Sequence, residues 1–358
     1  MKNSSAYLLV VLMIIVCFIA CKEQKNNKQS HKKADRTEKT YDTLSVNDGP
    51  YVFIEEKMLA IKNIVKGRVT SEQAALDIFI THFTPSISVY KNVDTIVALS
   101  DIHGQHDLGI KILQNNKVID ANNNWNLGKG HFVICGDIFD RGPKVTEFLW
   151  FIYNLEKQAE KVGGKVHFLL GNHEFMVLHN DTRYIHPKYK ITEKLLDKTY
   201  AELFGKETVL GRWIRSKATI LKINDNLFMH GGISETFLKE KFDIEFINQE
   251  FRLAIDRKKS EMKKTPFYKR YLGSKGPVWY RGYFKNKLSK KKINGILDKL
   301  DVKHVVVGHT SQKKVKQLYN HKIYAVDSSI KNGEYGEVLI IENGKYSRGA
   351  MNGERLEF

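Results

Sequence analysis

The chain has 358 residues, of which 42% are hydrophobic and 11% are aromatic. A chain of this length and composition can bury a sizeable core, so a small fold held together only by cross-links is excluded and one large domain, with or without insertions, is expected. The formal net charge is +18, and most of the excess is lysine scattered along the chain. We interpret this charge as a solvated lysine-rich surface. Attraction to anionic substrates or membrane surfaces stays open as a contributing property, but it does not by itself indicate a function.

The first segment of the chain predicts export. Residues 6–20, "AYLLVVLMIIVCFIA", carry no charge and follow Lys2. This run is short for a membrane-spanning helix and has the length of a signal-peptide core. It ends in "FIAC", which resembles the lipobox of bacterial lipoproteins, although Phe18 stands where Leu or Val is usual. The resemblance implies a lipoprotein signal peptide over 1–20, cleavage before Cys21 and lipidation of the Cys21 thiol. A plain signal anchor with an incidental cysteine is the alternative.

Either interpretation places the rest of the chain outside the cytoplasm, in the cell envelope, attached to a membrane through its N-terminus. Residues 22–40 are polar and almost without large apolar side chains, so they cannot offset the entropy of ordering. We expect a flexible polar linker over 21–48 and a folded domain over 49–358. With Cys17 removed and Cys21 acylated, only Cys135 remains, and no intramolecular disulfide can form.

Apolar runs and helical spacing alternate through the predicted domain, which indicates an α/β sandwich containing mixed β-sheets. Two stretches, roughly 180–216 and 234–300, are helical and charged, and are too long for simple connections; we interpret them as helical insertions or a lid over a site. Helices are predicted at 105–116, at 145–159 and from 175 onward. Strands are predicted within 49–65, 95–101, 131–137, 165–174, 218–232, 302–310, 322–329 and 336–349.

Histidines, carboxylates and other polar residues that can bind metal ions or phosphate stand where the predicted strands end. Because ligands gather beyond the carboxyl ends of strands in α/β sheets, we expect these loops to converge on one crevice. Imidazoles mixed with carboxylate and amide oxygens, and without thiolates, suit divalent ions such as Mn, Fe or Zn. The residues lie in the segments "SDIHG" (Asp101, His103), "GDIFDRG" (Asp137, Asp140, Arg141), "GNHE" (Asn172, His173, Glu174), "MHGG" (His230) and "GHT" (His309).

These five segments, in this order, resemble the signature of calcineurin-like metallophosphoesterases, specifically the phosphoprotein phosphatase (PPP) branch with its GDxxDRG and GNHE motifs. The resemblance extends from Asp94 to Asp327. A single motif of this kind would be weak, whereas five in order are specific. The family implies a metallophosphatase αββα sandwich of mixed β-sheets flanked by helices, with helical lid insertions.

The resemblance also implies a role for each matching residue. Asp137 would bridge two divalent metal ions. His173 would be the general acid that protonates the leaving oxygen, oriented by Asp140, and Arg141 would hold phosphate oxygens. Glu174 would support the ligands from behind without binding metal. The first ion would be bound by Asp101 and His103, and the second by Asn172, His230 and His309.

Within that branch, "GDIFDRG", "LLGNHEFMVLHNDTRYI" and "GPVWYRGYF" are most similar to the Shewanella-like protein phosphatases. This similarity implies that Arg183 lies near the substrate pocket and that Arg281 is a second catalytic arginine in contact with phosphate. From the residues alone, Arg281 could instead stack on Trp279 or Tyr280, and Arg183 could form a salt bridge on a helix surface. Other histidines, among them His131 and His167, are interpreted as structural or surface residues.

The resulting prediction is a dimetal-dependent phosphomonoester hydrolase that acts by in-line attack of a metal-bridging hydroxide, without a phosphoenzyme. Its implied substrates are proteins or peptides phosphorylated on Ser, Thr or Tyr, or small phosphoesters. A hydrolase of dinucleoside polyphosphates or other nucleotides, and a non-catalytic lipoprotein that binds phosphate or polyanions, remain as alternatives. A nuclease would rest on the positive charge alone. We interpret the basic run 257–276 as a solvated lid surface, so no specific nucleic-acid partner is expected.

Overall fold

The computed structural model describes residues 42–239, 241–285 and 288–358. The predicted signal peptide, Cys21 and most of the predicted linker fall outside these residues. Across the described ranges, no helix combines the length and the apolarity needed to cross a membrane. The described fold starts before residue 49, with a 3₁₀ turn η1 (Thr43–Ser45), and the side chains of Val46 and Asp48 are buried. The end of the expected linker is therefore part of the fold.

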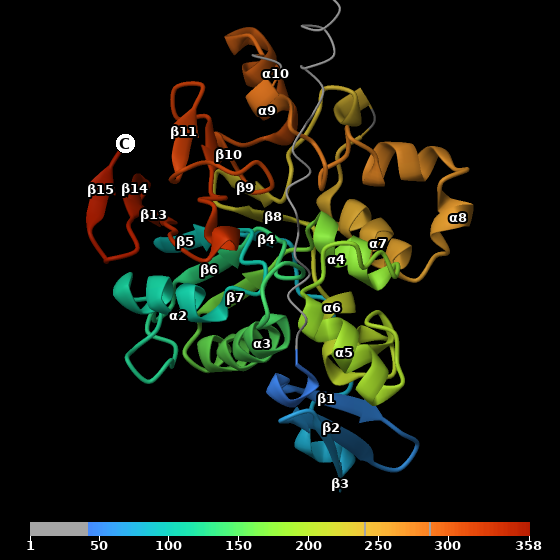
Figure 1. Ribbon diagram of the computed structural model, residues 1–358. Coiled ribbons are helices and arrows are strands. Elements are labelled where there is room, and N and C mark those ends of the chain that lie inside the picture. Colours follow the sequence, from blue (N-terminus) through green and yellow to red (C-terminus); the bar gives the residue numbers. More distant parts are fainter. Residues whose placement is uncertain (1–41, 240, 286–287) are drawn as a thin grey trace, which may run out of the picture. The chain divides into compact units, whose positions relative to one another are not determined.

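The first large sheet contains the strands that carry the first three motifs (Figure 1). In spatial order it consists of β15 (Arg355–Glu357), β14 (Lys345–Gly349), β13 (Val338–Glu342), β5 (Thr95–Leu99), β6 (His131–Ile134) and β7 (Lys165–Phe168). Strands β5, β6 and β7 are parallel, whereas β13 is antiparallel to β5. Strand β6 is buried along its whole length, as expected for a parallel strand covered on both faces.

The second large sheet carries the last two motifs. In spatial order it consists of β11 (Lys316–Leu318), β12 (Ile323–Ala325), β10 (His304–Val307), β9 (Asn226–Met229), β8 (Ile220–Ile223) and β4 (Val89–Tyr90). Strands β9, β10 and β12 are parallel, and β8 and β9 form the predicted hairpin. Strands β4 and β11 were not predicted, because runs of two or three residues carry too little periodicity to be recognised.

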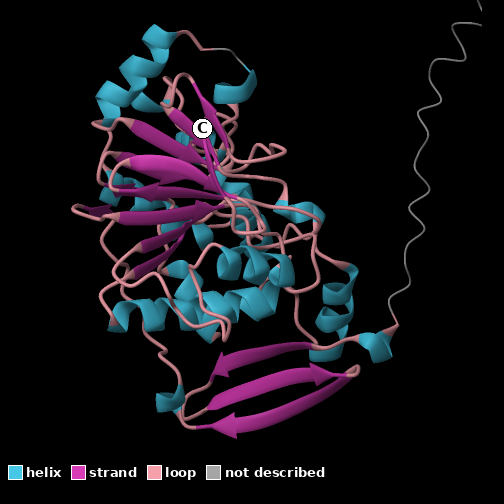
Figure 2. Ribbon diagram, turned by 90° about the vertical axis from the view of Figure 1, so that its left-hand side faces the viewer, coloured by secondary structure: helices cyan, strands magenta, loops and turns pink. Residues whose placement is uncertain are grey.

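The core lies between the two large sheets, which Figure 2 shows as layers of strands above the small N-terminal sheet. Ala98, Cys135 and Leu339 of the first sheet and its loops contact Phe228 and Val306 of the second. All five are almost or completely inaccessible to solvent. The predicted α/β sandwich of mixed sheets is confirmed. Burial, together with the Asp101 carboxylate, raises the pKa of the Cys135 thiol, which agrees with a packing role for this cysteine.

Helices α2 (His106–Asn115) and α3 (Val145–Lys161) follow the first two motifs and flank the first sheet (Figure 1). The predicted apolar face of α3 is buried, including Leu149 and Ile152. The next helix, α4 (Asn172–Leu178), begins three residues before the predicted start at Phe175. The earlier start follows from Glu174, whose carboxylate accepts the backbone N–H of Gly171 and so caps the first turn.

Both long insertions are helical, as predicted. The first contains α5 (Pro187–Leu196), the 3₁₀ turn η3 (Glu202–Phe204) and α6 (Val209–Arg215). The second contains η4 (Phe237–Lys239), α7 (Ile244–Ile255), α8 (Lys259–Met262), the π-turn η5 (Tyr268–Leu272), α9 (Gly282–Lys285) and α10 (Lys290–Leu300). A last 3₁₀ turn, η6 (Ile330–Asn332), lies between β12 and β13.

A separate three-stranded antiparallel sheet precedes the sandwich. It consists of β1 (Asp48–Ile54), β2 (Leu59–Val65) and β3 (Arg68–Ala74), and is followed by the turn η2 (Leu76–Ile78). Apart from Asp48, strands β1 and β2 fall within the predicted segment 49–65, but β3 was not predicted, because its residues are mostly polar and almost all exposed. The indole N–H of Trp150 on α3 donates to the carbonyl of Pro50 at 2.8 Å, which fixes this sheet to the helix layer.

Candidate active site

The predicted site residues come together where strands of both large sheets end. Asp101 and Asp137 follow β5 and β6, and Asn172 begins α4 after β7. From the second sheet, His230 follows β9 and His309 follows β10. Because β5, β6 and β7 are parallel, as are β9 and β10, their carboxyl ends present these loops to one another. All these side chains are buried.

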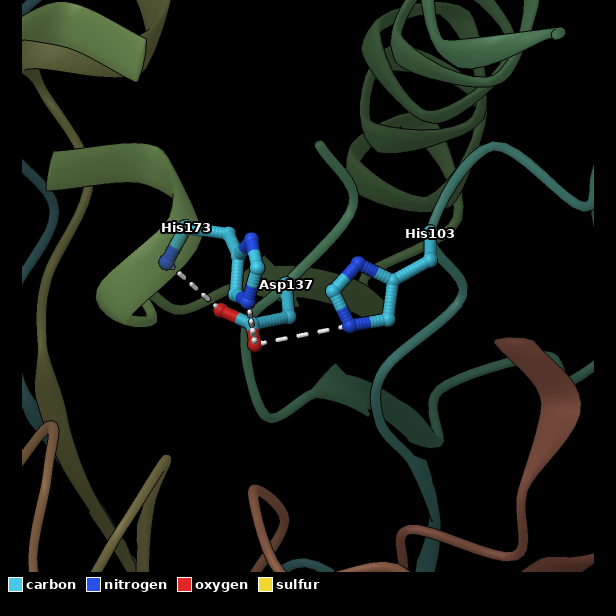
Figure 3. A group of neighbouring side chains, drawn as sticks. All are labelled: His103, Asp137 and His173. Carbon is cyan, nitrogen blue, oxygen red and sulfur yellow. Dashed lines mark hydrogen bonds and ion pairs between the residues drawn. The ribbon is translucent and has the colours of Figure 1, made fainter. Parts of the chain in front are cut away.

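One group of donor atoms contains His103, Asp137 and His173 (Figure 3). Nε2 of His103 lies 3.6 Å from Oδ2 of Asp137, and Nε2 of His173 lies 3.9 Å from the same oxygen. The backbone N–H of His173 also donates to Oδ1 of Asp137 at 3.0 Å. Asp101 is adjacent, with its Oδ1 3.7 Å from Nε2 of His103.

A second group contains Asp137, His230 and His309. Nε2 of His230 lies 3.1 Å from Oδ2 of Asp137, 3.1 Å from Nδ1 of His309 and 2.9 Å from Oδ1 of Asn172. Asp137 is thus shared by both groups. A carboxylate in this position suits the bridging role that the sequence resemblance implies.

The residues present fit two divalent cations. Nδ1 of His309 faces the other donors, 3.1 Å from Nε2 of His230, and its buried Nε2 has no hydrogen-bond partner among the described residues. Two imidazole nitrogens that face each other beside a carboxylate are suited to share a cation. The surrounding donors are imidazole, carboxylate and amide groups, which suit borderline or hard divalent ions. Asp101 also contacts the second group, since its Oδ2 accepts the backbone N–H of His309 at 2.8 Å.

Backbone carbonyls orient the imidazole rings of His103 and His230. Nδ1–H of His103 donates to the carbonyl of Phe139 at 2.6 Å, and Nδ1–H of His230 donates to the carbonyl of Cys135 at 2.7 Å. In both rings Nε2 is therefore the nitrogen left for a metal ion.

The buried Asp137 is kept anionic by its neighbours. Burial favours the neutral acid, but the imidazoles of His230 and His173 outweigh it and hold the pKa of Asp137 well below its usual range. Neighbouring charges also outweigh burial at His173. Burial favours the neutral ring, but Asp137 and Asp140 raise the pKa of the imidazole. The charges of the site therefore favour an anionic Asp137 and a protonated His173.

His173 is paired with Asp140, as the family resemblance implies. Nδ1 of His173 contacts Oδ2 of Asp140, and Asp140 is completely buried. Nε2 of His173 faces the shared Asp137. The pairing fixes the ring, so that a proton on Nε2 points toward the cluster.

Glu174 lies behind the ligands and contacts the backbone of the second motif. Its carboxylate accepts the N–H groups of Gly171, Asp137, Ile138 and Phe139, at 2.6, 2.9, 2.8 and 3.3 Å. Burial and the Asp137 carboxylate raise the pKa of Glu174 to about 7. The side chain shapes the loop that carries the shared ligand and does not join either donor group.

The three predicted arginines lie at different distances from the cluster. The guanidinium of Arg281 donates to the carbonyl of His309 and, at 3.1 Å, to Oγ1 of Thr310, which places it against a ligand loop. Arg141 is exposed and lies over the ring of Tyr184 at 5.3 Å. Arg183 has a side chain that is 66% exposed and pairs with Asp181, so it borders the approach to the site and not the ligands.

Two aromatic residues lie near the cluster, of which Tyr184 was not singled out from the sequence and Trp279 was considered only as a stacking partner for Arg281. The ring of Tyr184 lies 5.5 Å from that of His173 and contacts both Arg141 and Arg183. The ring of Trp279 lies 5.6 Å from that of His309. Both belong to segments that carry the family resemblance, Tyr184 next to Arg183 and Trp279 two residues before Arg281.

The loops of the site have unusual backbone geometry. Six site residues have φ between 46° and 74°, a left-handed conformation that costs free energy for any residue except glycine: Asp101, His103, Asp137, Asp140, Arg141 and His309. Gly136 has φ of 85°, and a Cβ atom there would lie 2.7 Å from the backbone of Gly171. The strained loops are held by the buried contacts described above.

Comparisons with known proteins agree with this geometry. The model of the calcineurin-like phosphoesterase family matches residues 94–313. The crystal structure of a cold-active protein-tyrosine phosphatase of a psychrophilic Shewanella species superposes with a TM-score of 0.82 at 39% identity, covering 87% of this chain and 99% of the other.

Two curated proteins are similar in sequence. Shewanella-like protein phosphatase 1 of Plasmodium berghei is 30% identical over 247 residues, which are 66% of this chain and 67% of that protein. Shewanella-like protein phosphatase 2 of Arabidopsis thaliana is 25% identical over 291 residues, which are 68% of this chain and 73% of that protein. With a family match that spans more than half of its residues, this chain belongs to the calcineurin-like phosphoesterase family.

Proposed function

We propose that the protein is a dimetal phosphomonoesterase of the Shewanella-like, PPP-type group and that it removes phosphate from phosphorylated proteins, with phosphotyrosine among its substrates. The observation that carries the proposal is the position of Asp137, whose carboxylate belongs to two adjacent groups of buried donors. A site with one shared carboxylate suits the clamping of a phosphoryl group between two cations.

Six residues would hold the ions. When bound, the two ions polarise the phosphoryl oxygens and lower the pKa of bound water. The imidazole, carboxylate and amide donors suit Mn, Fe or Zn. The first position would be formed by Asp101, His103 and Asp137, and the second by Asp137, Asn172, His230 and His309.

The remaining groups of the site would act on the substrate itself. His173, held by Asp140, would donate its Nε2 proton to the leaving oxygen. Arg281, fixed to the loop of His309, would bind the phosphate oxygens as a bidentate donor. Arg141 would close the other side while it remains stacked on Tyr184. Arg183, farther out, would contact only the rest of the substrate.

Two observations support phosphotyrosine as a substrate. The similar Shewanella protein is described as a protein-tyrosine phosphatase. In this chain, the ring of Tyr184 lies beside His173 and the ring of Trp279 beside His309. Aromatic side chains at the rim of a phosphate site favour a flat aryl leaving group through ring contacts.

The test compares substrates at equal concentration with the metal-loaded protein. We expect hydrolysis of a phosphotyrosyl peptide and of an aryl phosphate, and little hydrolysis of diadenosine tetraphosphate. A clear preference for the dinucleotide would contradict the protein-phosphatase assignment and favour the nucleotide hydrolase. Phosphate binding without turnover of any of the three would instead favour the non-catalytic binding protein.

We also propose that the enzyme is a lipoprotein of the cell envelope, with residues 1–20 as signal peptide, lipid on Cys21, and a polar linker ahead of the catalytic domain. This proposal is supported by the uncharged run 6–20 and the "FIAC" motif. Growth with radiolabelled fatty acid should label the protein, and Cys21→Ala should abolish the label. Equal labelling of both forms would contradict lipidation at Cys21.

A further inference from the structure

A cavity of about 860 Å³ opens beside the candidate active site. Its walls come from the loop after α4, from α8, and from the segment that links η5 to α9. Arg281 and Trp279 line its inner end, and both contact His309. Met176, whose Sδ lies 3.9 Å from Nδ2 of Asn172, lines it as well. The cavity is therefore the approach to the metal residues.

The charges around this cavity are almost all positive. Asp181 is the single carboxylate among the described residues that line it. The cationic lining residues are Arg183, Lys259, Lys263, Lys275, Arg281 and Lys285. We call this cavity the lysine groove. Clefts lined by one sign of charge concentrate ligands of the opposite sign.

Three of these lysines have no ion-pair partner among the residues that the structure describes. Asp181 is already engaged by Arg183, at 2.7 Å, and by Lys259, at 3.2 Å. In contrast, Lys263, Lys275 and Lys285 are exposed, and none forms an ion pair with another residue that the structure describes. The groove thus has unneutralised charge in three separate places along its wall.

This excess of positive charge is not shared by every cavity of the molecule. The cavity of about 260 Å³ that lies over α3 and α6 is lined by Glu156 and Glu160 as well as by Lys157 and Lys217. There the charges balance, and Lys217 is paired with Glu156 at 2.8 Å. The lysine groove differs from that cavity, because its unpaired lysines stand at the approach to the proposed phosphate site.

We propose that the lysine groove binds acidic residues that flank the phosphorylated side chain, so that the preferred substrates are phosphorylated segments rich in Asp and Glu. This inference rests on the proposed protein-phosphatase function. An extended peptide advances about 3.3 Å per residue, so residues within a few positions of the phosphate can reach the groove. Apolar walls at Met176 and Leu272 suit peptide side chains. The Asp181 carboxylate would repel a ligand that is negatively charged along its whole length, such as a nucleic-acid strand.

The test uses the full chain and two phosphotyrosyl peptides of equal length, one with flanking Glu residues and one with Gln at the same positions. The measured quantity is the ratio of their kcat/KM values, which does not depend on the fraction of folded or metal-loaded protein. If each lysine contributes as an exposed ion pair does, the ratio for the native protein is about tenfold at low salt. It should shrink as added salt screens these charges.

Two triple variants separate the groove from general charge. Lys263→Gln/Lys275→Gln/Lys285→Gln should bring the ratio to within about twofold. The control Lys57→Gln/Lys111→Gln/Lys129→Gln removes the same charge from exposed lysines outside the groove and should keep the native ratio. A ratio near one for the native protein, or an equal fall in both variants, would overturn the proposal.

Two further arms complete the experiment. If neither peptide nor an aryl phosphate is hydrolysed, the proposed function fails. The groove is then tested separately with non-hydrolysable phosphonate versions of the two peptides, whose binding is measured by fluorescence anisotropy. Tighter binding of the acidic version supports the groove, and equal binding contradicts it. A single-stranded oligonucleotide that competes at lower concentration than an unphosphorylated acidic peptide would overturn the proposal in favour of a nucleic-acid ligand.

Discussion

His173 is held by a carboxylate that is shielded from solvent. Asp140 is completely buried, and its Oδ1 has no hydrogen-bond partner among the described residues, so its single side-chain contact is the one from Oδ2 to His173. Asp140 and Asp137 together raise the pKa of the His173 imidazole against the effect of burial. This arrangement suits a proton donor better than it suits a neutral ligand.

We expect His173→Asn to lower kcat for phenyl phosphate by about 10²- to 10⁴-fold, because phenolate leaves slowly without a proton. The loss for p-nitrophenyl phosphate should be much smaller, since nitrophenolate is a good leaving group. Asp140→Asn should follow the same pattern with a smaller loss. Steady-state kinetics at saturating metal measure both.

The control for this pair is His106→Asn, since His106 stands at the start of α2 and contacts the exposed Asp107. It should leave both rates unchanged. Equal losses for the two leaving groups in His173→Asn would assign His173 to metal binding and not to proton transfer.

Glu174 shapes the loop of Asp137 through four backbone N–H groups. In Glu174→Gln one oxygen is replaced by an amide that cannot accept these bonds. We expect the metal concentration for half-maximal activity to rise about 10- to 100-fold. The free energy of unfolding should fall by about 1–3 kcal/mol. Metal titration and urea unfolding measure the two effects.

Glu202→Gln is the matched control, because Glu202 also accepts a backbone N–H, from Thr199 at 2.7 Å, but is exposed and belongs to an insertion. It should change neither quantity appreciably. If Glu174→Gln behaves like this control, the side chain does not support the metal loop.

At the level of elements, the neighbouring strands β6 and β7 bring two histidines into contact, His131 from the start of β6 and His167 from within β7. Nε2 of His167 lies 3.0 Å from Nδ1 of His131, and the ring of Tyr90 on β4 lies 5.0 Å from each. Burial, with Lys165 nearby, lowers the pKa of His131 to about 4. Burial and His131 hold the pKa of His167 well below its usual range.

This pair predicts a dependence of stability on pH. In the unfolded chain both rings take up protons near pH 6.5, whereas in the fold His131 does so only near pH 4 and His167 below its usual range. Stability is therefore complete above about pH 7 and is lost as the pH falls from 6.5 toward 4. Between pH 7 and 5 the His131 ring alone should cost about 2 kcal/mol, and His167 should add to this loss.

Urea unfolding of the metal-free protein at pH 5, 6 and 7 tests this expectation. His131→Phe/His167→Phe should flatten the dependence, because neither ring then takes up a proton. His321→Asn, at an exposed turn, should keep the native slope. A double variant with the native slope would show that other groups control acid sensitivity.

For the molecule as a whole, the order of the motifs and the rule that ligands gather at strand ends were sufficient to predict the sandwich and the grouping of the metal residues. Each residue, such as Asp137 or His309, follows a buried strand, so its position is set by the sheet and not by its loop. For this reason residues far apart in sequence could be assigned to one site.

Other features depend on contacts that a sequence pattern does not encode. The polar strand β3 is placed by its pairing with β2, which its own residue pattern does not reveal. The contacts of Tyr184 with two arginines, and the gathering of Lys263, Lys275 and Lys285, depend on how the helical insertions fold back over the sheet ends. Local periodicity predicts those helices but not which of their surfaces faces the site.

The central claim is that Asp137 joins two metal sites that together drive phosphomonoester hydrolysis. The most direct measurement is the rate of aryl phosphate hydrolysis by the metal-free protein during titration with Mn²⁺, for the native chain and for Asp137→Asn. For the native chain, we expect no activity before addition and a rise that levels off at two equivalents per chain. For Asp137→Asn, we expect a loss of at least about 10²-fold at any metal concentration. Full activity in the chelated native protein, or native activity in Asp137→Asn, would contradict the account.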